Sequence, residues 1–304
     1  MSGTQHSTHS SFDEATGRLI EQAHRCATLP VMEDYLPYPN MGEMWHDLAM
    51  EEGDRLWLSY YPCAGDSEEA ATFTFAQFGD LIERVARLLA TQYDIRAGGS
   101  VATLTVNQPL TVAIYFACWR LGARVVPINP SESDDRVTYI LGNSEATLFI
   151  VHSSTRENLA PLEKLLAGSK MKFAMVLDGS KRALEAGWDD FQSALETVKS
   201  AGEPAAPPAV SWDSEALVVY TSGTTGNPKG VVLTQKQMFA DAYSISQWHG
   251  IDEHTVIMNV LPIHHVNGTI VTLLTPAFVG AQVVMNRRFR TGGFWAKLAR
   301  HDVA

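Results

Sequence analysis

The chain has 304 residues, of which 45% are hydrophobic and 19% are charged, and its formal net charge at pH 7 is -11. This length and composition are typical of a globular protein with room for two cores, and they exclude an intrinsically disordered chain. The acidic balance argues against nucleic acid as a partner, because phosphates would be repelled. Any site for a polyanion must therefore be built locally from cations.

Cysteine usage and the polar N-terminus indicate a protein of the reducing cytoplasm. Cys26, Cys63 and Cys118 are odd in number, far apart and without a Cys-x-x-Cys pair, so neither a disulfide framework nor a zinc site is expected. Met1–Ser11 lacks the apolar core of a signal peptide and is expected to be a disordered tail. The uncharged stretch 254–286 is interrupted by prolines, glycines and a histidine pair, which favours buried core over a membrane span.

Hydrophobic periodicity predicts helices and strands that alternate along the chain. The expected helices are Phe12–Cys26, Met44–Met50, the stretch opened by a capping box of Thr74 and Gln77, Pro109–Leu121, a helix capped by Ser131 and ending at Leu141, Thr155–Leu166, Asp189–Ser200, Lys236–Trp248, Thr269–Phe278 and Gly293–Arg300. The expected strands are Leu56–Tyr61, Ala71–Phe75, Val101–Val106, Arg124–Ile128, Ala146–Val151, Lys172–Leu177, Ala216–Tyr220, Val231–Leu233, Thr255–Leu261 and Gln282–Met285. Strand-helix alternation with apolar strands predicts an α/β fold whose mainly parallel sheets are covered on both faces.

The most informative stretch is the loop between the strands expected at 216–220 and 231–233, both of which are predicted to be buried. Its glycines let the backbone approach a ligand, and its hydroxyl, amide and ammonium groups suit the phosphates of a nucleotide. The candidate ligand-binding residues are Thr221, Ser222, Gly223, Thr224, Thr225, Gly226 and Lys229. The Walker loop places Gly-Lys-Ser/Thr at the start of a helix. Here Lys229 is followed by glycine and β-branched residues, so we expect a connection between two strands. A plain glycine-rich turn is the alternative, but it does not require hydroxyls, proline and lysine together.

A second polar motif, Leu-Pro-Ile-His-His-Val-Asn-Gly, closes the strand expected at Thr255–Leu261. Imidazole titrates near neutrality, so His264 and His265 could bind a metal or act as a base. Adjacent residues of an extended strand point to opposite sides, which makes the pair a poor two-ligand metal site. The residues alone leave open that one histidine is packed and the other partly exposed.

The loop resembles the phosphate loop of the adenylate-forming superfamily, which comprises acyl- and aryl-CoA synthetases, luciferases and the adenylation domains of peptide synthetases. The helix after Thr74, the turn at Gly98-Gly99 and the Pro-Ile-Asn-Pro run at 127–130 also fall where that family has them. The resemblance runs from about Pro37 to the last residue and implies two stacked α/β lobes, the second incomplete. The implied domains are a tail at 1–11, a helical segment at 12–36, a partial lobe formed by 37–71 with 250–304, and a first lobe at 72–249 that carries the phosphate loop.

The resemblance implies an acid-thiol ligase that uses ATP, Mg²⁺ and CoA. Such an enzyme activates a carboxylic acid as an acyl-adenylate and then transfers the acyl group to CoA. The loop would hold the phosphates, Thr224 would also contact the metal, and Lys229 would support either the loop or a phosphate.

His265 matches the catalytic-site histidine that lines the acyl pocket, whereas His264 stands where an aromatic residue is usual. Peptide-synthetase domains tend to carry Phe-Asp here. Because this motif has no carboxylate, the expected substrate is a fatty or aromatic acid without an α-ammonium group.

The family's later motifs, including a ribose-binding Asp and a C-terminal Lys, have no counterparts up to residue 304. The chain is therefore expected to be an N-terminal fragment that is inactive alone. The alternatives are a non-enzymatic remnant that binds nucleotide or a protein partner, an adenylation domain for another acceptor, and an unrelated ATP-using enzyme with a convergent loop. The expected partner is a small carboxylic acid. Neither nucleic acid binding nor a transmembrane segment is expected, and the residues leave open whether the protein forms a homo-oligomer.

Overall fold

The computed structural model describes residues 36–62, 70–156, 158–177, 184, 187–198, 210–221 and 227–303. Residues Tyr38–Ala304 form one compact unit. The tail predicted at 1–11 and the helix predicted at Phe12–Cys26 lie outside the described residues. The predicted lobe boundaries stay predictions, whereas the α/β class with mainly parallel sheets is confirmed by the strand pairing.

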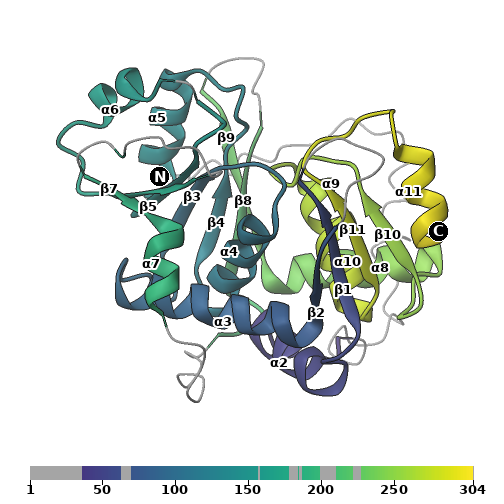
Figure 1. Cartoon of the computed structure of the whole chain (residues 1–304). Helices are drawn as coiled ribbons and strands as arrows, with labels where there is room; N and C mark the ends of the chain where they lie inside the picture. Colours follow the sequence, from purple (N-terminus) through teal and green to yellow (C-terminus); the bar gives the residue numbers. More distant parts are fainter. Residues whose placement is uncertain are drawn as a thin grey trace, which may run out of the picture. The chain divides into compact units, whose positions relative to one another are not determined.

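Seven strands form the larger sheet in the order β7-β6-β5-β3-β4-β8-β9 (Figure 1). The strands are β3 (Ser100–Leu104), β4 (Arg124–Pro127), β5 (Leu148–His152), β6 (Lys172–Val176), β7 (Trp188–Asp190), β8 (Glu215–Thr221) and β9 (Lys229–Thr234). Neighbouring strands are parallel except for the β8–β9 hairpin. Strand β3 lies between β4 and β5, so the strand order reverses there. Open parallel sheets bind ligands at the carboxyl ends of strands beside such a reversal.

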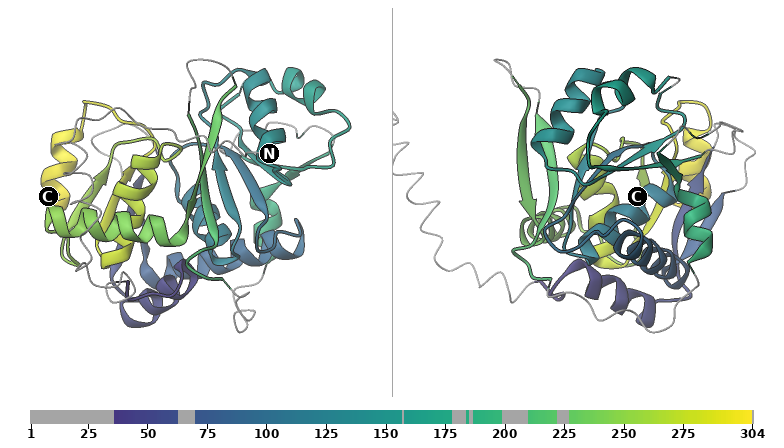
Figure 2. Two further views of the ribbon diagram at one scale, coloured as in Figure 1. Left: turned by 180° about the vertical axis from the view of Figure 1, so that it is seen from behind. Right: turned by 90° about the vertical axis from the view of Figure 1, so that its left-hand side faces the viewer.

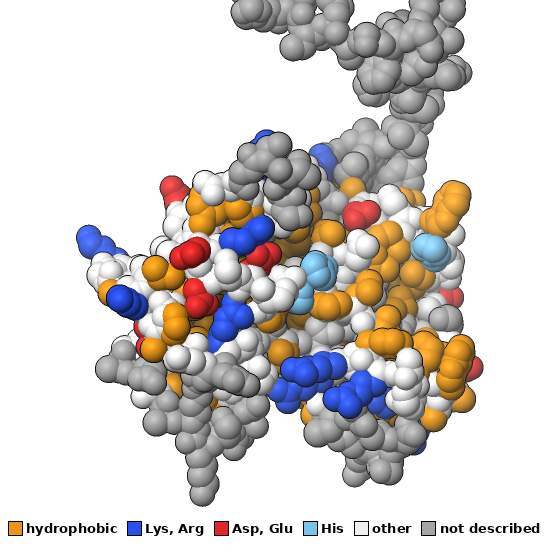
Figure 3. Space-filling model, turned by 90° about the horizontal axis from the view of Figure 1, so that it is seen from above, with side chains coloured by type: hydrophobic (Ala, Val, Ile, Leu, Met, Phe, Trp, Pro, Cys, Tyr) orange, Lys and Arg blue, Asp and Glu red, His pale blue; other side chains and the backbone are white. Residues whose placement is uncertain are grey.

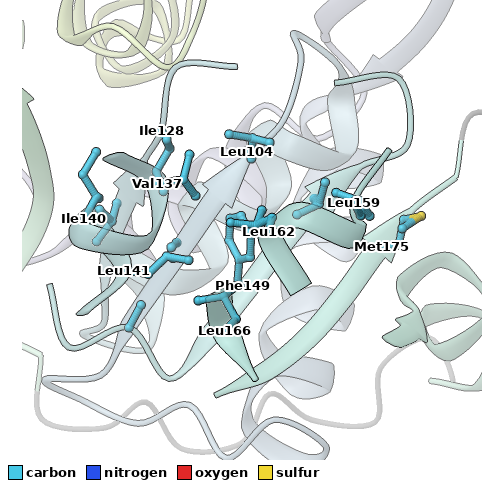
Figure 4. Packing of buried hydrophobic residues seen from close by; sticks show 14 of the residues in the cluster. Leu104, Ile128, Val137, Ile140, Leu141, Phe149, Leu159, Leu162, Leu166 and Met175 are labelled. Carbon is cyan, nitrogen blue, oxygen red and sulfur yellow. The ribbon is translucent and has the colours of Figure 1, made fainter. Parts of the chain in front are cut away.

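Helices cover both faces of this sheet (Figure 2). They are α2 (Met41–Glu51), α3 (Phe75–Thr91), α4 (Pro109–Arg120), α5 (Asp134–Asn143), α6 (Ala160–Leu166) and α7 (Phe191–Thr197). Apolar side chains of α5 and α6 pack on one face in a cluster with side chains of β3, β5 and β6 (Figure 4). On the other side α4 is buried along its length and is contacted by α2 and α3. A helix that is apolar nearly all round is the kind that becomes fully enclosed.

The smaller sheet has the order β10-β11-β1-β2 and is parallel except between β1 and β2. Its strands are β1 (Leu56–Tyr61), β2 (Ala71–Thr74), β10 (Val256–Asn259) and β11 (Gln282–Asn286). The remaining helices are α8 (Gln235–His249), α9 (Val266–Thr269), the π-helix η2 (Ile270–Leu274), α10 (Thr275–Val279) and α11 (Phe294–His301). The helix predicted at Thr269–Phe278 is therefore present, but its middle is π-helical. In the part of the chain that the structure describes, no helix is long and apolar enough to cross a bilayer.

One buried side chain joins the two sheets. Asn107 follows β3, and its Nδ2 donates to Asn259 Oδ1 at 2.8 Å and to the Leu261 carbonyl at 2.9 Å. Its Oδ1 accepts the backbone N–H of Ile263 at 2.9 Å. The chain that leaves β10 is thus bonded to the end of β3, which brings the carboxyl ends of the two sheets together.

Two local predictions are wrong in ways that the contacts explain. The cap of α5 is Ser133, which accepts the Arg136 N–H; the predicted cap, Ser131, instead bonds through its N–H and hydroxyl to Asn129. Strand β9 was predicted to be buried, yet most of it is exposed, including Val231 at 47%. The strand lies at the edge of the sheet, with β8 as its neighbour among the described strands, and its side chains Val231 and Val232 remain exposed.

Two helices begin later than their periodicity predicts. The helix predicted to start at Thr155 starts at Ala160, because the Thr155 hydroxyl donates to the carbonyl of His152 at 2.7 Å and closes a turn after β5. Helix α7 likewise begins after the predicted Asp189, because Asp190 is its N-cap and accepts two N–H groups of the first turn.

We expect Asn107→Ala to lower the free energy of unfolding by about 3 kcal/mol, because it leaves the buried Ile263 N–H and the buried Asn259 side-chain oxygen without this partner. Urea unfolding of the purified chain measures the change. The matched control is Asn267→Ala, an exposed position on α9, for which we expect a change of about 0.5 kcal/mol or less. An unaltered midpoint in Asn107→Ala would show that other contacts hold the sheets together.

Candidate functional site

A cleft of about 460 Å³ lies where the carboxyl ends of strands from both sheets meet. The larger sheet lines it with residues that follow three adjacent strands, among them Thr105 and Asn107 after β3, Asn129 after β4 and Ser154 after β5. The smaller sheet lines it with Val260, Pro262 and His264 after β10 and with Arg287, Arg288 and Phe289 after β11. The fold therefore places a pocket of ligand size at the position where parallel sheets bind their ligands.

The electrostatics of the cleft are opposite to those of the chain. Arg287 and Arg288 line it, and none of the described residues that line it is Asp or Glu. Figure 3 shows this face from above, with a hollow, histidine side chains at its edge and Lys and Arg side chains gathered beside it. A protein of net charge -11 thus has a locally cationic pocket, which favours an anionic ligand.

The histidine pair lies in a turn, which corrects the prediction that it belongs to an extended strand. Strand β10 ends at Asn259, and the His264 and His265 ring centres lie 4.4 Å apart and do not point to opposite sides. His264 is half-buried and lines the cleft, whereas His265 is exposed and is the residue before α9. The proposed role of His265 in an acyl pocket stays a prediction.

A close backbone approach sets the shape of this turn. A Cβ atom at Gly268 would lie 2.2 Å from the carbonyl oxygen of Pro262, which no real side chain can do. The absence of a side chain lets the start of α9 pack directly on the turn. The Thr269 hydroxyl then donates to the carbonyl of Ile263 at 2.5 Å and holds the turn closed.

Burial, and to a smaller extent the charge of the neighbouring His265, lower the pKa of His264 to about 4. The side chain is therefore a neutral imidazole at physiological pH, able to donate one hydrogen bond and accept another. In this state it adds no charge to the cationic wall of the cleft.

The candidate phosphate loop connects two strands, as the sequence predicts. The β8–β9 hairpin pairs Thr221 with Lys229, and both of these residues are exposed at its loop end. Helix α8 begins only after β9, at a cap formed by Thr234. Residues Ser222, Gly223, Thr224, Thr225 and Gly226 lie outside the described residues, so their roles stay predictions.

A tyrosine beside the loop end of this hairpin bonds to the end of helix α5. Tyr220 donates its hydroxyl to Asn143 Oδ1, at the end of α5, over 2.6 Å. A Cβ atom at Gly230 would lie 3.1 Å from the Tyr220 ring and 3.0 Å from Val218, so glycine makes room for this ring. The strands that carry Thr221 and Lys229 are thus anchored although the hairpin is at the sheet edge.

Four polar residues of the cleft to which the sequence analysis assigned no role are Asn107, Ser154, Arg287 and Arg288. Each follows a strand directly or within a few residues, which is the signal that could have drawn attention to it. The run Arg287-Arg288-Phe289-Arg290 was a second signal, because three arginines in four residues are unusual in so acidic a chain. No local pattern indicates that residues 107 and 287 face the same space.

The family model described as AMP-binding enzyme matches residues 47–303. Curated relatives include a sulfoacetate–CoA ligase of Cupriavidus necator, 30% identical over 79% of this chain and 44% of its own length. A crotonobetaine/carnitine–CoA ligase of Salmonella choleraesuis is 30% identical over 86% of this chain and 49% of its own length. The chain spans about half the length of the curated relatives it matches.

Solved structures have the same fold. The o-succinylbenzoate CoA synthetase of Bacillus subtilis, solved with its acyl-adenylate intermediate, has a TM-score of 0.70 at 26% identity, and the match covers 88% of this chain and 48% of that one. An acyl-CoA synthetase of Brucella canis has a TM-score of 0.73 at 23% identity, over 87% of this chain and 46% of that one. At 23% identity, the match to the Brucella canis structure supports the fold alone.

We expect the stability of the chain to rise with pH between about pH 4 and about pH 6.5 through His264. In this range the unfolded histidine binds a proton and the folded one does not, so protonation favours unfolding. His301, whose pKa is lowered by burial and by Arg300 and Lys297, acts in the same direction. Urea unfolding at several pH values should therefore show a shallower slope for His264→Phe than for the unaltered chain. Identical slopes would contradict a neutral, half-buried His264.

Proposed function

Because the chain belongs to the AMP-binding enzyme family, we propose that it forms the phosphate-binding part of an enzyme that activates a carboxylic acid with ATP and transfers it to CoA. The observation that carries the proposal is the β8–β9 hairpin, which presents the loop from Thr221 to Lys229 at the carboxyl edge of the sheet. Strand β8 pairs with β4, whose end lines the cleft, so the loop and the cleft share one edge. The printed names of both curated relatives, which are CoA ligases, support the same chemistry.

The reaction has two balanced steps. A carboxylate oxygen of the acid attacks the α-phosphorus of ATP, which forms the acyl-adenylate and releases pyrophosphate. The thiol of CoA then attacks the acyl carbon, and AMP leaves. Catalysis of the first step requires two anions to be held in line while charge on the departing pyrophosphate is neutralised.

The residues at the loop end of the hairpin fit a triphosphate. Thr221 offers a hydroxyl and Lys229 an ammonium, and both are exposed there. Between them we assign phosphate contacts to Ser222, Thr224 and Thr225, with Gly223 and Gly226 supplying amides and clearance. Mg²⁺, when bound beside Thr224, supplies positive charge to the phosphate oxygens. The Tyr220 anchor keeps the two ends of the loop in register for this contact.

The acid would lie in the cleft, with the histidine turn as part of its wall. His264 supplies a neutral polar group in the cleft, whereas His265, the proposed acyl-pocket residue, is exposed beside it and is not among the described residues that line the cleft. Since the motif from Leu261 to Gly268 contains no carboxylate, we assign substrates without an α-ammonium group, fatty or aromatic. Amino acids would leave their ammonium without a counter-charge at this point.

We expect Thr224→Val and Gly226→Val to lower acid-dependent ATP–pyrophosphate exchange by about 100-fold or more in the full-length protein. The first removes a hydroxyl from the developing charge, and the second blocks close approach of the backbone to phosphate. Residues 1–304 alone are expected to show no exchange with any acid.

The matched control is Gly142→Val, because Gly142 lies on the exposed side of α5 and a Cβ atom there would meet no described atom within 4 Å. It should leave exchange unaltered, and urea unfolding should show that all variants are folded. Normal exchange in both loop variants would contradict the role of the loop.

We expect the full-length protein to activate plain carboxylic acids in preference to amino acids of the same carbon skeleton. Trapping of the adenylate with hydroxylamine gives the comparison, using pairs such as phenylacetate against phenylglycine. A clear preference for the amino acids would overturn the assignment of the substrate class.

A further inference from the structure

A second hollow, of about 350 Å³, lies at the opposite end of the larger sheet from the cleft. This amino-end hollow is lined by Glu163, residues 166–169, Phe173, Gly187 and Trp188. Strands β5, β6 and β7 are parallel, so the residues that begin β6 and β7 place it at their amino ends, whereas the cleft lies at the carboxyl ends of β3, β4 and β5. None of the described residues that line the hollow also lines the cleft, so the two are separate.

A carboxylate is the charged group of the amino-end hollow. Among the described residues that line it, Glu163 alone carries a charge. This residue lies on α6 and is half-buried, and its Oε1 atom is shielded from water with no hydrogen-bond partner in the part of the chain that the structure describes. A shielded carboxylate oxygen without a partner costs free energy, which a bound donor or cation would recover.

Two aromatic rings stand beside this carboxylate. Phe173 and Trp188 are direct partners across β6 and β7, so their side chains lie on the same face of the sheet. Their ring centres are 5.2 Å apart, and the ring planes meet at 41°, which makes an aromatic corner. Trp188 also packs on Phe149 of β5, with ring centres 6.4 Å apart. Because the face of an aromatic ring attracts positive charge, the rings and the carboxylate favour the same kind of ligand.

Two glycines keep the rim of the hollow open. Gly168 and Gly187 have positive φ angles of 84° and 91°, and a Cβ atom at either would meet nothing within 4 Å. The turns that lead into β6 and β7 therefore bring no side chain over the hollow at these two positions. A volume of about 350 Å³ is within the range of small-molecule sites and leaves room for an ammonium group with an apolar body.

We propose that the amino-end hollow binds a small organic cation, an alkylammonium or quaternary ammonium compound, through the Glu163 carboxylate and the rings of Phe173 and Trp188. The carboxylate meets the positive charge, and the N–H or N–CH₃ groups lie against the aromatic corner. A carboxylate repels anions, so this ligand is neither the acid nor the nucleotide of the proposed function. The inference goes beyond that function and does not depend on it.

The test compares compounds of similar shape that differ in charge. Isothermal titration calorimetry on the purified chain measures binding of choline against dimethylbutanol, its uncharged isostere, and of phenethylamine against phenethyl alcohol. At low salt we expect each cation to bind at least about fivefold more tightly than its neutral counterpart, with the difference shrinking as ionic strength rises. Equal affinities within both pairs, or no binding of either cation at up to about 10 mM, would overturn the proposal.

Two variants locate the charge that is recognised. Glu163→Gln keeps the size of the side chain and removes its charge, and it should reduce the preference for each cation to about twofold or less. Glu196→Gln is the matched control, because Glu196 is exposed on α7 and does not line the hollow. It removes the same charge from the acidic chain and should keep the full preference. An equal loss of preference in both variants would show a general attraction of cations to the chain and refute a localised site.

A third variant tests the aromatic corner. Phe173→Leu should weaken the binding of choline by about threefold or more and that of dimethylbutanol by about twofold or less, because the ring attracts the charged compound alone. Urea unfolding verifies that each variant is folded. Equal weakening of the two compounds would show that Phe173 only fills space and would overturn its part in the recognition.

A further measurement separates this inference from the proposed function. Glu163→Gln in the full-length protein should leave acid-dependent pyrophosphate exchange unaltered, because Glu163 lies at the other end of the sheet from the cleft. Normal exchange without cation binding would defeat the inference and leave the proposed function standing. Cation binding without exchange would do the reverse.

Discussion

A buried amide is the central polar contact between the two sheets, beside the Arg287–Ser154 bond and the packing of Trp57 on Phe116. Asn107 satisfies one acceptor and one donor of the chain leaving β10 and also bonds the side chain of Asn259. Asn259 in turn bonds Thr272, whose hydroxyl donates to the Gly268 carbonyl at 2.6 Å. This network runs from the end of β3 to the π-helical turn. Because each member is buried, the loss of one partner leaves polar groups without water to replace it.

The side chains that line the cleft come from both sheets, so their arrangement depends on how the two sheets are held together. The larger sheet supplies neutral polar side chains, and the smaller sheet supplies the arginines and the histidine turn. The cleft is lined by residues of both sheets, and the bond from Arg287 to Ser154 joins residues that are 133 positions apart in the chain. The composition of the cleft, cationic on one side and neutral polar on the other, is thus a property of the interface between the two sheets.

The sequence predicted the fold class, the strand-to-strand nature of the phosphate loop and nearly all of the elements, because those depend on local periodicity and capping. The Thr74–Gln77 box is present as predicted. Some errors at helix starts arose from short-range turn contacts, such as that of Thr155 with His152, and others arose where position in the sheet or a close backbone approach decided the outcome. Exposure of β9 depends on its place at the sheet edge, and the histidine turn depends on Gly268. The juxtaposition of Asn107 with Ile263 could not be predicted, since no local pattern reports which loops meet across two sheets.

The contact at Gly268 has a consequence for how variation in this chain should be interpreted. Any residue other than glycine would bring its Cβ atom against the Pro262 carbonyl, so the helix start or the histidine turn would have to shift. In a saturation mutagenesis screen it would score with the residues that touch substrate, although it has no side chain with which to bind anything. Intolerance at 268 therefore measures how closely two stretches of backbone must approach, and a map of essential positions in this region records geometry as well as chemistry.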